Sequence, residues 1–258
     1  MGEQRVVFVL PPDYEASKET YPAVIAFAGL GESVRGNRAG AWGWVERYGV
    51  VPAMAALHRR ALTGEDFQGL VRGGRLKAWN AALAKQAYRG LVLVCPYPPR
   101  IRRWSAKRLK AWEAWLLEEL IPYTERHLRV VGGPEGWGVD GISLGGLLST
   151  YVGFKHPEAF SSIGSVQGAV SNLGGRIRRL ARRNREVLAT RALNVATSKG
   201  DGFRRSLKEF HTWLGEHGLP HRFTVLPGRH DKRFVKGPGS LEMLLFHDRA
   251  LRGGGPLP

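Results

Sequence analysis

Cysteine is almost absent from this chain of 258 residues, and long apolar runs are absent as well. The single Cys95 excludes an internal disulfide framework and a cysteine-rich zinc site. The longest apolar run, Ala23–Leu30, is far shorter than the roughly 20 residues that cross a bilayer. No charged segment followed by an apolar core opens the chain, so no signal peptide is visible. If the chain is full length, we therefore expect it in the cytoplasm. If a leader has been removed from it, we expect the protein in the periplasm or outside the cell.

Acidic residues are scarce relative to basic ones: 22 Asp and Glu stand against 39 Lys and Arg, which gives a net charge of +17. Such a surface favours anionic partners, which include nucleic acid, an anionic membrane and an anionic substrate. The length and the 43% share of apolar residues are typical of a globular protein with a full core. We expect residues 1–258 to form one domain, because large α/β domains often reach this size.

Short apolar segments alternate with amphipathic ones along the chain, which predicts strands alternating with helices. The predicted strands are Arg5–Leu10, Ala23–Phe27, Leu91–Cys95, Trp137–Gly141, Ser162–Val166, Leu193–Thr197 and Phe223–Leu226. The predicted helices are Ala111–Leu128, Leu144–His156, Arg204–Glu216 and Ser240–Leu251. Strands that are apolar along their whole length are typical of a mostly parallel sheet with helices on both faces.

The segment Gly141-Ile142-Ser143-Leu144-Gly145 is the strongest sign of chemistry. It lies between a predicted strand and a predicted helix, where a Gly-x-Ser-x-Gly turn lifts the serine hydroxyl above the edge of the sheet. The glycines are needed because backbones crowd at such a turn, and the positive end of the following helix favours a developing oxyanion. We predict that Ser143 is a nucleophile; the alternative is a glycine-rich turn with a capping serine.

A serine nucleophile needs a base, and the base needs an orienting carboxylate. Among the histidines after Ser143, His230 follows the carboxyl end of a predicted strand, the edge at which catalytic groups of parallel sheets gather. Asp201 follows the preceding strand in a Gly-Asp-Gly loop and is the predicted acid. The alternatives are a loop histidine that caps a helix and an aspartate that caps a turn or a helix.

Two backbone N–H groups are expected to form an oxyanion hole. One belongs to Leu144, directly after the nucleophile, and the other to the loop after the early central strand. That loop reads Ala28-Gly29-Leu30-Gly31, and we choose Leu30 first and Gly31 second.

Two segments interrupt the alternation of strands and helices. Residues 32–90 separate two predicted strands by far more than an ordinary crossover. We expect this segment to form a cap over one end of the sheet, with Trp42 and Trp44, together with Gln167, in contact with substrate. The alternative is a helical decoration far from any site. The second segment, Leu173–Leu188, carries six arginines around an apolar helical stripe.

Taken together, these segments resemble the esterase D branch of the α/β-hydrolases, which includes feruloyl esterases, S-formylglutathione hydrolases, siderophore esterases and mycolyltransferases. The resemblance rests on VVFVLPPDY, YPAVIAFAGLGES, EELIPYTERHLRV, GVDGISLGGLLSTYVGFKHPEAFSSIGSVQGA, ATSKGDGF and LPGRHDKRF. It covers most of the chain, from about Arg5 to Arg252, outside the two inserted segments. It implies a three-layer α/β-hydrolase fold in which Ser143, Asp201 and His230 are nucleophile, acid and base.

The chain departs from the family's pattern at two places. The usual His-Gly-Gly of the oxyanion loop reads Ala28-Gly29-Leu30, and the aromatic residue that often follows the catalytic histidine is replaced by Asp231-Lys232-Arg233. These departures bear on the oxyanion donor and on the substrate more than on the triad.

We therefore predict a serine carboxylic-ester hydrolase that forms an acyl-serine intermediate and needs no metal and no organic cofactor. Its substrate would be a small-molecule or lipid-like ester, and its basic surface would attract an anionic one. Acyl transfer to an alcohol uses the same residues and is one alternative.

A second, less favoured alternative is a non-catalytic basic protein of this fold that binds nucleic acid, another anionic polymer or a membrane surface. It rests on the arginines of Leu173–Leu188 and on a second basic cluster. That cluster comprises Arg100, Arg102, Arg103, Lys107, Arg108 and Lys110.

A Gly-x-Gly-x-x-Gly pattern at 136–141 does not indicate a dinucleotide site, because these residues must form the strand that precedes Ser143.

Overall fold

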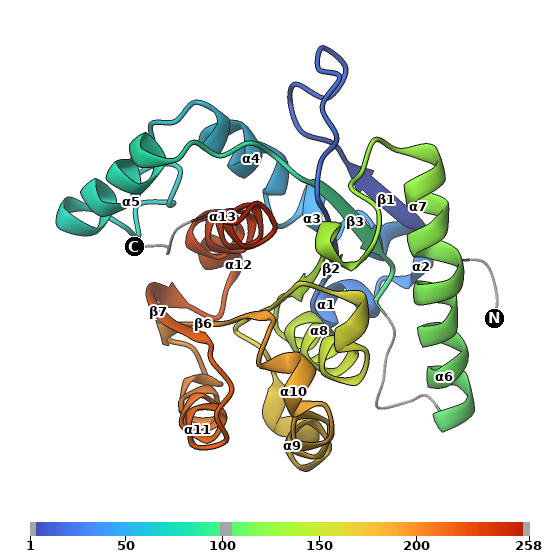
Figure 1. The fold of residues 1–258 in the computed structure, drawn as a ribbon. Coiled ribbons are helices and arrows are strands. Elements are labelled where there is room, and N and C mark those ends of the chain that lie inside the picture. Colours follow the sequence, from blue (N-terminus) through green and yellow to red (C-terminus); the bar gives the residue numbers. More distant parts are fainter. Residues whose placement is uncertain (1–3, 99–104, 255–258) are drawn as a thin grey trace.

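A sheet of seven strands runs through the middle of the molecule in the computed structural model, which describes residues 4–98 and 105–254 (Figure 1). Its strands are β1 Val6–Val9, β2 Ala23–Phe27, β3 Val92–Pro96, β4 Trp137–Gly141, β5 Ser162–Val166, β6 Ala192–Gly200 and β7 Arg222–Arg229. The spatial order is β1-β3-β2-β4-β5-β6-β7, and β1 alone runs antiparallel to its neighbour. The predicted mostly parallel sheet is confirmed. Arg100, Arg102 and Arg103 of the predicted basic cluster lie outside the described residues.

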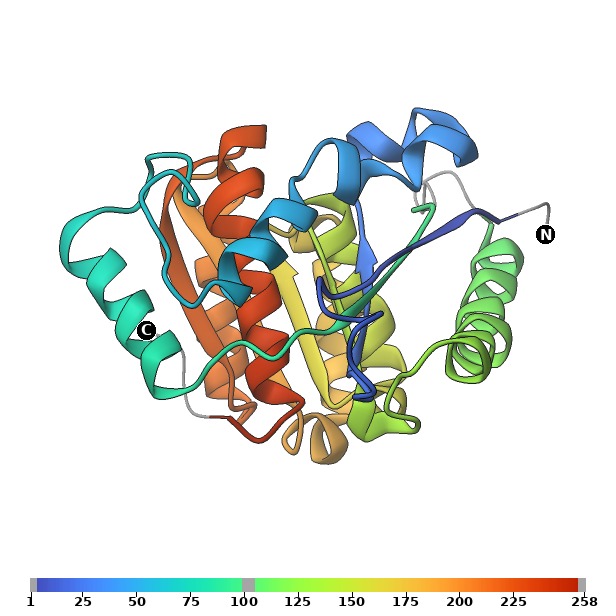
Figure 2. The same cartoon turned by 90° about the horizontal axis from the view of Figure 1, so that it is seen from above.

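Helices cover both faces of the sheet, and this gives the three layers of an α/β-hydrolase. One face carries α6 Ala106–Ala114, the π-helical turn η2 Trp115–Leu120, α7 Ile121–His127, α8 Leu144–Lys155, α9 Gly174–Arg183, α10 Arg185–Leu188 and α11 Arg204–Glu216. The other carries α4 Val50–His58, α5 Gly73–Lys85, α12 Lys232–Phe234, the π-helical turn η6 Val235–Gly239 and α13 Ser240–Ala250. Figure 2 shows α4, α5 and α13 on the opposite side of the sheet from α8, α9 and α11.

Short helices occupy the connections. After β2 come α1 Leu30–Ser33, α2 Gly36–Gly40 and α3 Gly43–Glu46, and single turns of 3-10 helix are η3 Pro134–Gly136, η4 Pro157–Ala159 and η5 Val170–Leu173. The described residues contain no helix that is both long enough and apolar enough to span a bilayer.

Alternate residues of each central strand enter different cores. In β2, the side chains of Ala23, Ile25 and Phe27 pack against α8 and its neighbours, whereas those of Val24 and Ala26 face α4 and α13. All five β2 residues are fully buried. This two-sided burial is why the strands read as unbroken apolar runs in the sequence.

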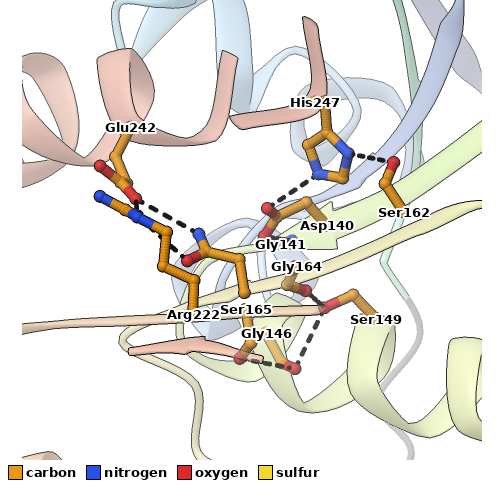
Figure 3. Close-up of polar contacts among 11 residues, drawn as sticks. Asp140, Gly141, Gly146, Ser149, Ser162, Gly164, Ser165, Arg222, Glu242 and His247 are labelled. Carbon is orange, nitrogen blue, oxygen red and sulfur yellow. Dashed lines mark hydrogen bonds and ion pairs between the residues drawn. The ribbon is translucent and has the colours of Figure 1, made fainter. Parts of the chain in front are cut away.

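Helix α13 is attached to the sheet by buried polar contacts as well as by apolar packing (Figure 3). His247 forms hydrogen bonds through both ring nitrogens: Nε2 lies 3.0 Å from Asp140 Oδ2 of β4, and Nδ1 lies 2.7 Å from the Ser162 hydroxyl of β5. Glu242, one and a half turns earlier, pairs with Arg222 of β7 and with Asn194 of β6. These contacts fix the helix across four strands.

Two glycines make room for this arrangement. A Cβ at Gly164 would lie 1.9 Å from Asp140 Oδ2, and a Cβ at Gly138 would lie 2.5 Å from Ser162 Oγ. Burial raises the pKa of Asp140 even though the hydrogen bond from His247 opposes this. Polar groups enclosed in this way are costly unless they are paired, so the pairing specifies how α13 sits on the sheet.

The segment 32–90 has two parts with different roles. Its later part packs on the face of the sheet: α4 lies against α13, and Phe67 and Trp79 meet edge to face at 5.2 Å inside the same core. Its beginning, as far as Tyr48, lies beside the carboxyl end of β2. The cap over one end of the sheet stays a prediction, and the later part of the segment also forms a layer of the fold.

Candidate active site

Ser143 sits at the turn between β4 and α8 in a strained backbone conformation, with φ 58° and ψ −113°. A Cβ at Gly145 would lie 2.0 Å from the carbonyl oxygen of Phe27, and one at Gly141 would lie 2.3 Å from the carbonyl carbon of Gly145. Side chains at these two positions would collide with backbone, so the sequence needs glycine there. Strain of this kind is typical of a nucleophile turn that exposes a serine at the start of a helix.

His230 and Asp201 meet at the same edge of the sheet. His230 directly follows β7, Asp201 directly follows β6, and His230 Nδ1 lies 2.9 Å from Asp201 Oδ1. The two strands remain paired beyond the rest of the sheet, as far as Gly200 and Arg229. This extension brings the two side chains together.

Asp201 is held as a carboxylate. Burial acts to raise its pKa, but hydrogen bonds from His230, from the Thr197 hydroxyl at 2.6 Å and from the Phe203 N–H at 3.0 Å outweigh it, and the pKa lies below its ordinary value. An ionised carboxylate only accepts hydrogen bonds, so Nδ1 of His230 carries the proton that it donates to Asp201. Among the described residues, no group forms a hydrogen bond with Nε2.

Ser143 and His230 line the same open cleft, whose volume is about 320 Å³. Its lining consists of Gly29, Leu30, Gly31, Glu32, Arg47, Tyr48, Ile142, Ser143, His230, Asp231, Lys232 and Val235. The cleft thus collects residues from the loops after β2, β4 and β7.

Three backbone N–H groups beside this cleft are free to bind an anion. Leu144 opens α8, and Leu30 and Gly31 open α1. No described group accepts a hydrogen bond from any of these three N–H groups. They are the donors that the sequence predicted for the oxyanion hole.

A polar network that sequence reasoning missed lies behind the loop of Gly29. The Gly29 N–H donates to the Tyr48 hydroxyl at 3.1 Å, and that hydroxyl donates to the buried carboxylate of Glu32. Arg47 Nε lies 2.7 Å from the other oxygen of Glu32. Burial and the neighbouring Glu32 raise the pKa of Tyr48, so its hydroxyl keeps its proton. Only the presence of Glu32 directly after the loop could have hinted at this network.

The three residues expected to contact substrate do not line the cleft. Trp44 is 1% exposed, donates to the Ala26 carbonyl at 3.0 Å and packs edge to face on Tyr48, so it is a core residue. Gln167 is fully buried. Trp42 is 40% exposed but lies outside the lining. The expectation for Trp44 and Gln167 is thus corrected, because burial keeps their side chains from solvent.

The structure contains a second Ser-His-Asp set, which the sequence did not suggest. His247 of α13 meets Asp140 of β4 and Ser162 of β5 (Figure 3), and all three residues are fully buried. No substrate can reach them, so their role is structural.

Within the described part of the chain, no group of three or more His, Cys, Asp or Glu side chains could hold a metal ion.

Comparison with known proteins adds a family match to this geometry. The sequence profile of the family described as "Putative esterase" matches residues 1–188. An uncharacterized protein, YbbA of Bacillus subtilis (strain 168), is 37% identical over 54 residues, which are 21% of this chain and 22% of that protein. The match therefore spans about a fifth of the curated relative.

Several solved structures share the fold. A ferulic acid esterase superimposes with a TM-score of 0.69 at 18% identity, over 96% of this chain and 99% of that one. The S-formylglutathione hydrolase of Staphylococcus aureus gives a TM-score of 0.59 at 11% identity, over 96% and 100%. The enterobactin esterase of Shigella flexneri gives 0.61 at 16% identity, over 95% of this chain and 55% of that one. At these identities the likeness is one of fold.

Proposed function

We propose that this chain, which belongs to the "Putative esterase" family, is a hydrolase of the carboxylesterase type whose chemistry is carried out by Ser143, His230 and Asp201. The observation that carries the proposal is the pairing of His230 with Asp201 at 2.9 Å in a cleft that Ser143 also lines. A nucleophile, a base and an orienting acid at one sheet edge are what acyl transfer needs.

In the proposed reaction, Ser143 Oγ attacks the ester carbonyl while His230 Nε2 takes its proton. Asp201 holds the imidazole in the required tautomer and stabilises the cation that forms. The N–H groups of Leu144 and Leu30 receive the developing oxyanion. His230 then returns the proton to the departing alcohol, and water releases the acyl group from Ser143 by the same steps in reverse order.

The proposed substrates are small-molecule or lipid-like carboxylic esters. Structures with the same fold are named as esterases of ferulic acid and of enterobactin and as a hydrolase of S-formylglutathione, so esters of aromatic acids and thioesters belong in the first panel. The cleft is open and about 320 Å³ in volume, which suits a small acyl group with the rest of the substrate outside.

The test is turnover of p-nitrophenyl acetate and labelling by a fluorophosphonate. We expect Ser143→Ala to lower kcat by at least about 10³-fold and to abolish labelling, while its thermal unfolding stays close to that of the parent protein. The matched control is Ser161→Ala, because Ser161 precedes β5 and lies at the edge of the sheet opposite to Ser143. This variant should keep both turnover and labelling. Turnover retained by Ser143→Ala would remove this serine from the mechanism. Product analysis with added alcohol separates hydrolysis from acyl transfer.

A further inference from the structure

Gln167 follows the carboxyl end of β5 and has a left-handed backbone, with φ 47°. Its neighbours hold the nucleophile turn on both sides. The Val166 carbonyl accepts from the Ser143 N–H at 3.0 Å, and the Ala169 N–H donates to the Ser143 carbonyl at 3.0 Å. A left-handed conformation is unfavourable for a residue with a side chain, so the surrounding contacts must impose it.

The side chain of Gln167 reaches the other two catalytic loops. Its Nε2 donates to Ser198 Oγ at 2.7 Å and to the Arg229 carbonyl at 3.1 Å. Ser198 belongs to β6, and its carbonyl accepts from the Asp201 N–H at 3.2 Å. Arg229 is the last residue of β7 and directly precedes His230. One carboxamide therefore joins the strand of the acid to the strand of the base.

Glutamine suits this position for a chemical reason. Both partners present oxygen atoms, and a carboxamide nitrogen supplies two N–H donors from a single atom. A glutamate of the same size would place carboxylate oxygen against the Arg229 carbonyl, and a methionine would offer no donor. The side chain is fully buried, so water cannot replace a lost contact without entering the core.

We propose that Gln167 is a positioning residue that sets the distance between His230 and Ser143. It does so by tying the loops after β6 and β7 to the segment that brackets the nucleophile turn. This inference rests on the proposed serine hydrolase function and extends it to a residue that does not touch substrate. Displacement of a catalytic group by a fraction of an ångström lowers the rate of the chemical step without changing how substrate binds.

The test compares Gln167→Met and Gln167→Glu with the parent protein. We expect kcat for p-nitrophenyl acetate and the fluorophosphonate labelling rate to fall by between about 10-fold and 100-fold, with KM unchanged within about threefold. The control is Gln68→Met, because Gln68 is also a glutamine of positive φ (54°) but is exposed and outside the cleft. Its kcat should equal that of the parent.

A double substitution tests the path through Ser198. If the carboxamide acts through this hydroxyl, adding Ser198→Ala to Gln167→Met should not lower kcat further. The proposal is overturned if Gln167→Met and Gln167→Glu both keep kcat within twofold of the parent, whatever their melting temperatures. Should one of these variants not fold, the other decides. Failure of the parent protein itself to react with fluorophosphonate would instead overturn the proposed function.

Discussion

Asp201 shows how one residue sets the protonation pattern of the site. Its carboxylate has three donors, and their combined effect keeps its pKa low despite burial. Because the folded protein favours the ionised form, this group contributes stability at neutral pH, and the contribution is lost as the pH falls through its lowered pKa. The lowered pKa therefore favours a charged carboxylate, which accepts the hydrogen bond from Nδ1 of His230.

Replacement of Asp201 by asparagine tests this assignment. We expect Asp201→Asn to lower kcat by about 10³–10⁴-fold, because an amide N–H facing His230 would favour the wrong tautomer. The comparison is Thr197→Val, which removes one of the three donors and should lower kcat by roughly tenfold or less. Steady-state kinetics on p-nitrophenyl acetate give both values. Equal activity of Asp201→Asn and the parent would assign the acid role elsewhere.

Tyr48 supports the oxyanion loop through a single hydroxyl. Tyr48→Phe leaves the Gly29 N–H and a Glu32 oxygen without their partner, so we expect a lower kcat together with a loss of about 1–3 kcal/mol in the free energy of unfolding. Tyr14→Phe is the matched control. Tyr14 is equally buried but lies away from the cleft. Its hydroxyl accepts a hydrogen bond from the Arg129 N–H at 2.7 Å. It should cost stability without changing kcat, and a parallel loss of kcat in the control would contradict a local role for Tyr48.

The candidate site could be predicted from the sequence where its residues follow a strand directly. Ser143, Asp201 and His230 each stand within a residue or two of a strand end, and parallel strands place such positions at one edge. Tyr48 does not follow a strand and could not be assigned in this way. Gln167 directly follows β5 and was predicted at this edge, but as a substrate contact. Their roles depend on side-chain contacts with Glu32, Ser198 and the Arg229 carbonyl, and no local pattern in the sequence specifies these contacts.

Among the elements, α13 carries several buried charged residues, and Asp248 is one of them. Asp248 accepts from the Arg89 N–H and from Arg252 Nε, each at 3.2 Å, yet burial dominates and raises its pKa to about 6. The unfolded chain would titrate this group near pH 4. Between these two values Asp248 binds more protons in the folded state, so its contribution to the free energy of unfolding decreases as the pH rises from about 4 to about 6.

Asp248→Asn should remove this dependence. We compare the free energy of unfolding of the parent with that of Asp248→Asn at each pH. Between pH 4 and pH 7 the parent should lose on the order of 2 kcal/mol relative to the variant. Urea titrations at several pH values measure it. Glu19→Gln, which alters a surface carboxylate, should leave the dependence unchanged. A constant difference across this range would show that folding does not shift the pKa of Asp248.

The sequence predicted most of the strands and helices, but it did not predict where each of them begins and ends. The predicted strand Ala23–Phe27 and helix Arg204–Glu216 coincide with β2 and α11. The predicted helix Ala111–Leu128 begins earlier, at Ala106, because Ser105 accepts from the Arg108 N–H and caps it. Strand β7 extends beyond the apolar run as far as Arg229 because it pairs with β6, and an apolar pattern does not record such pairing.

At the scale of the whole molecule, the positive charge is spread over surfaces away from the cleft as well as near it. On α9, Arg178 and Arg182 lie over the ring of Trp213, and Arg176 lies over Tyr151. Guanidinium groups placed over aromatic rings contribute to packing as well as to charge. The arginine-rich segment is thus part of how α9 is attached to α8 and α11.

The net charge of +17 should still affect association with charged substrates. We expect kcat/KM for an ester that carries a carboxylate to fall several-fold as ionic strength rises from about 0.02 M to 0.5 M, and kcat/KM for a neutral ester of the same acyl group to stay constant. Lys232→Ala should weaken the effect because Lys232 lines the cleft, whereas Arg183→Ala on α9 should not. An identical salt dependence for both esters would exclude steering by charge.

The crowding around Ser143 limits how this enzyme can diversify. Since a side chain at position 141 or 145 would collide with main chain, a saturation library at either position should yield glycine among its active members and little else. Changes in selectivity are therefore better sought at the rim of the cleft, at Leu30 and Lys232, than in the turn itself.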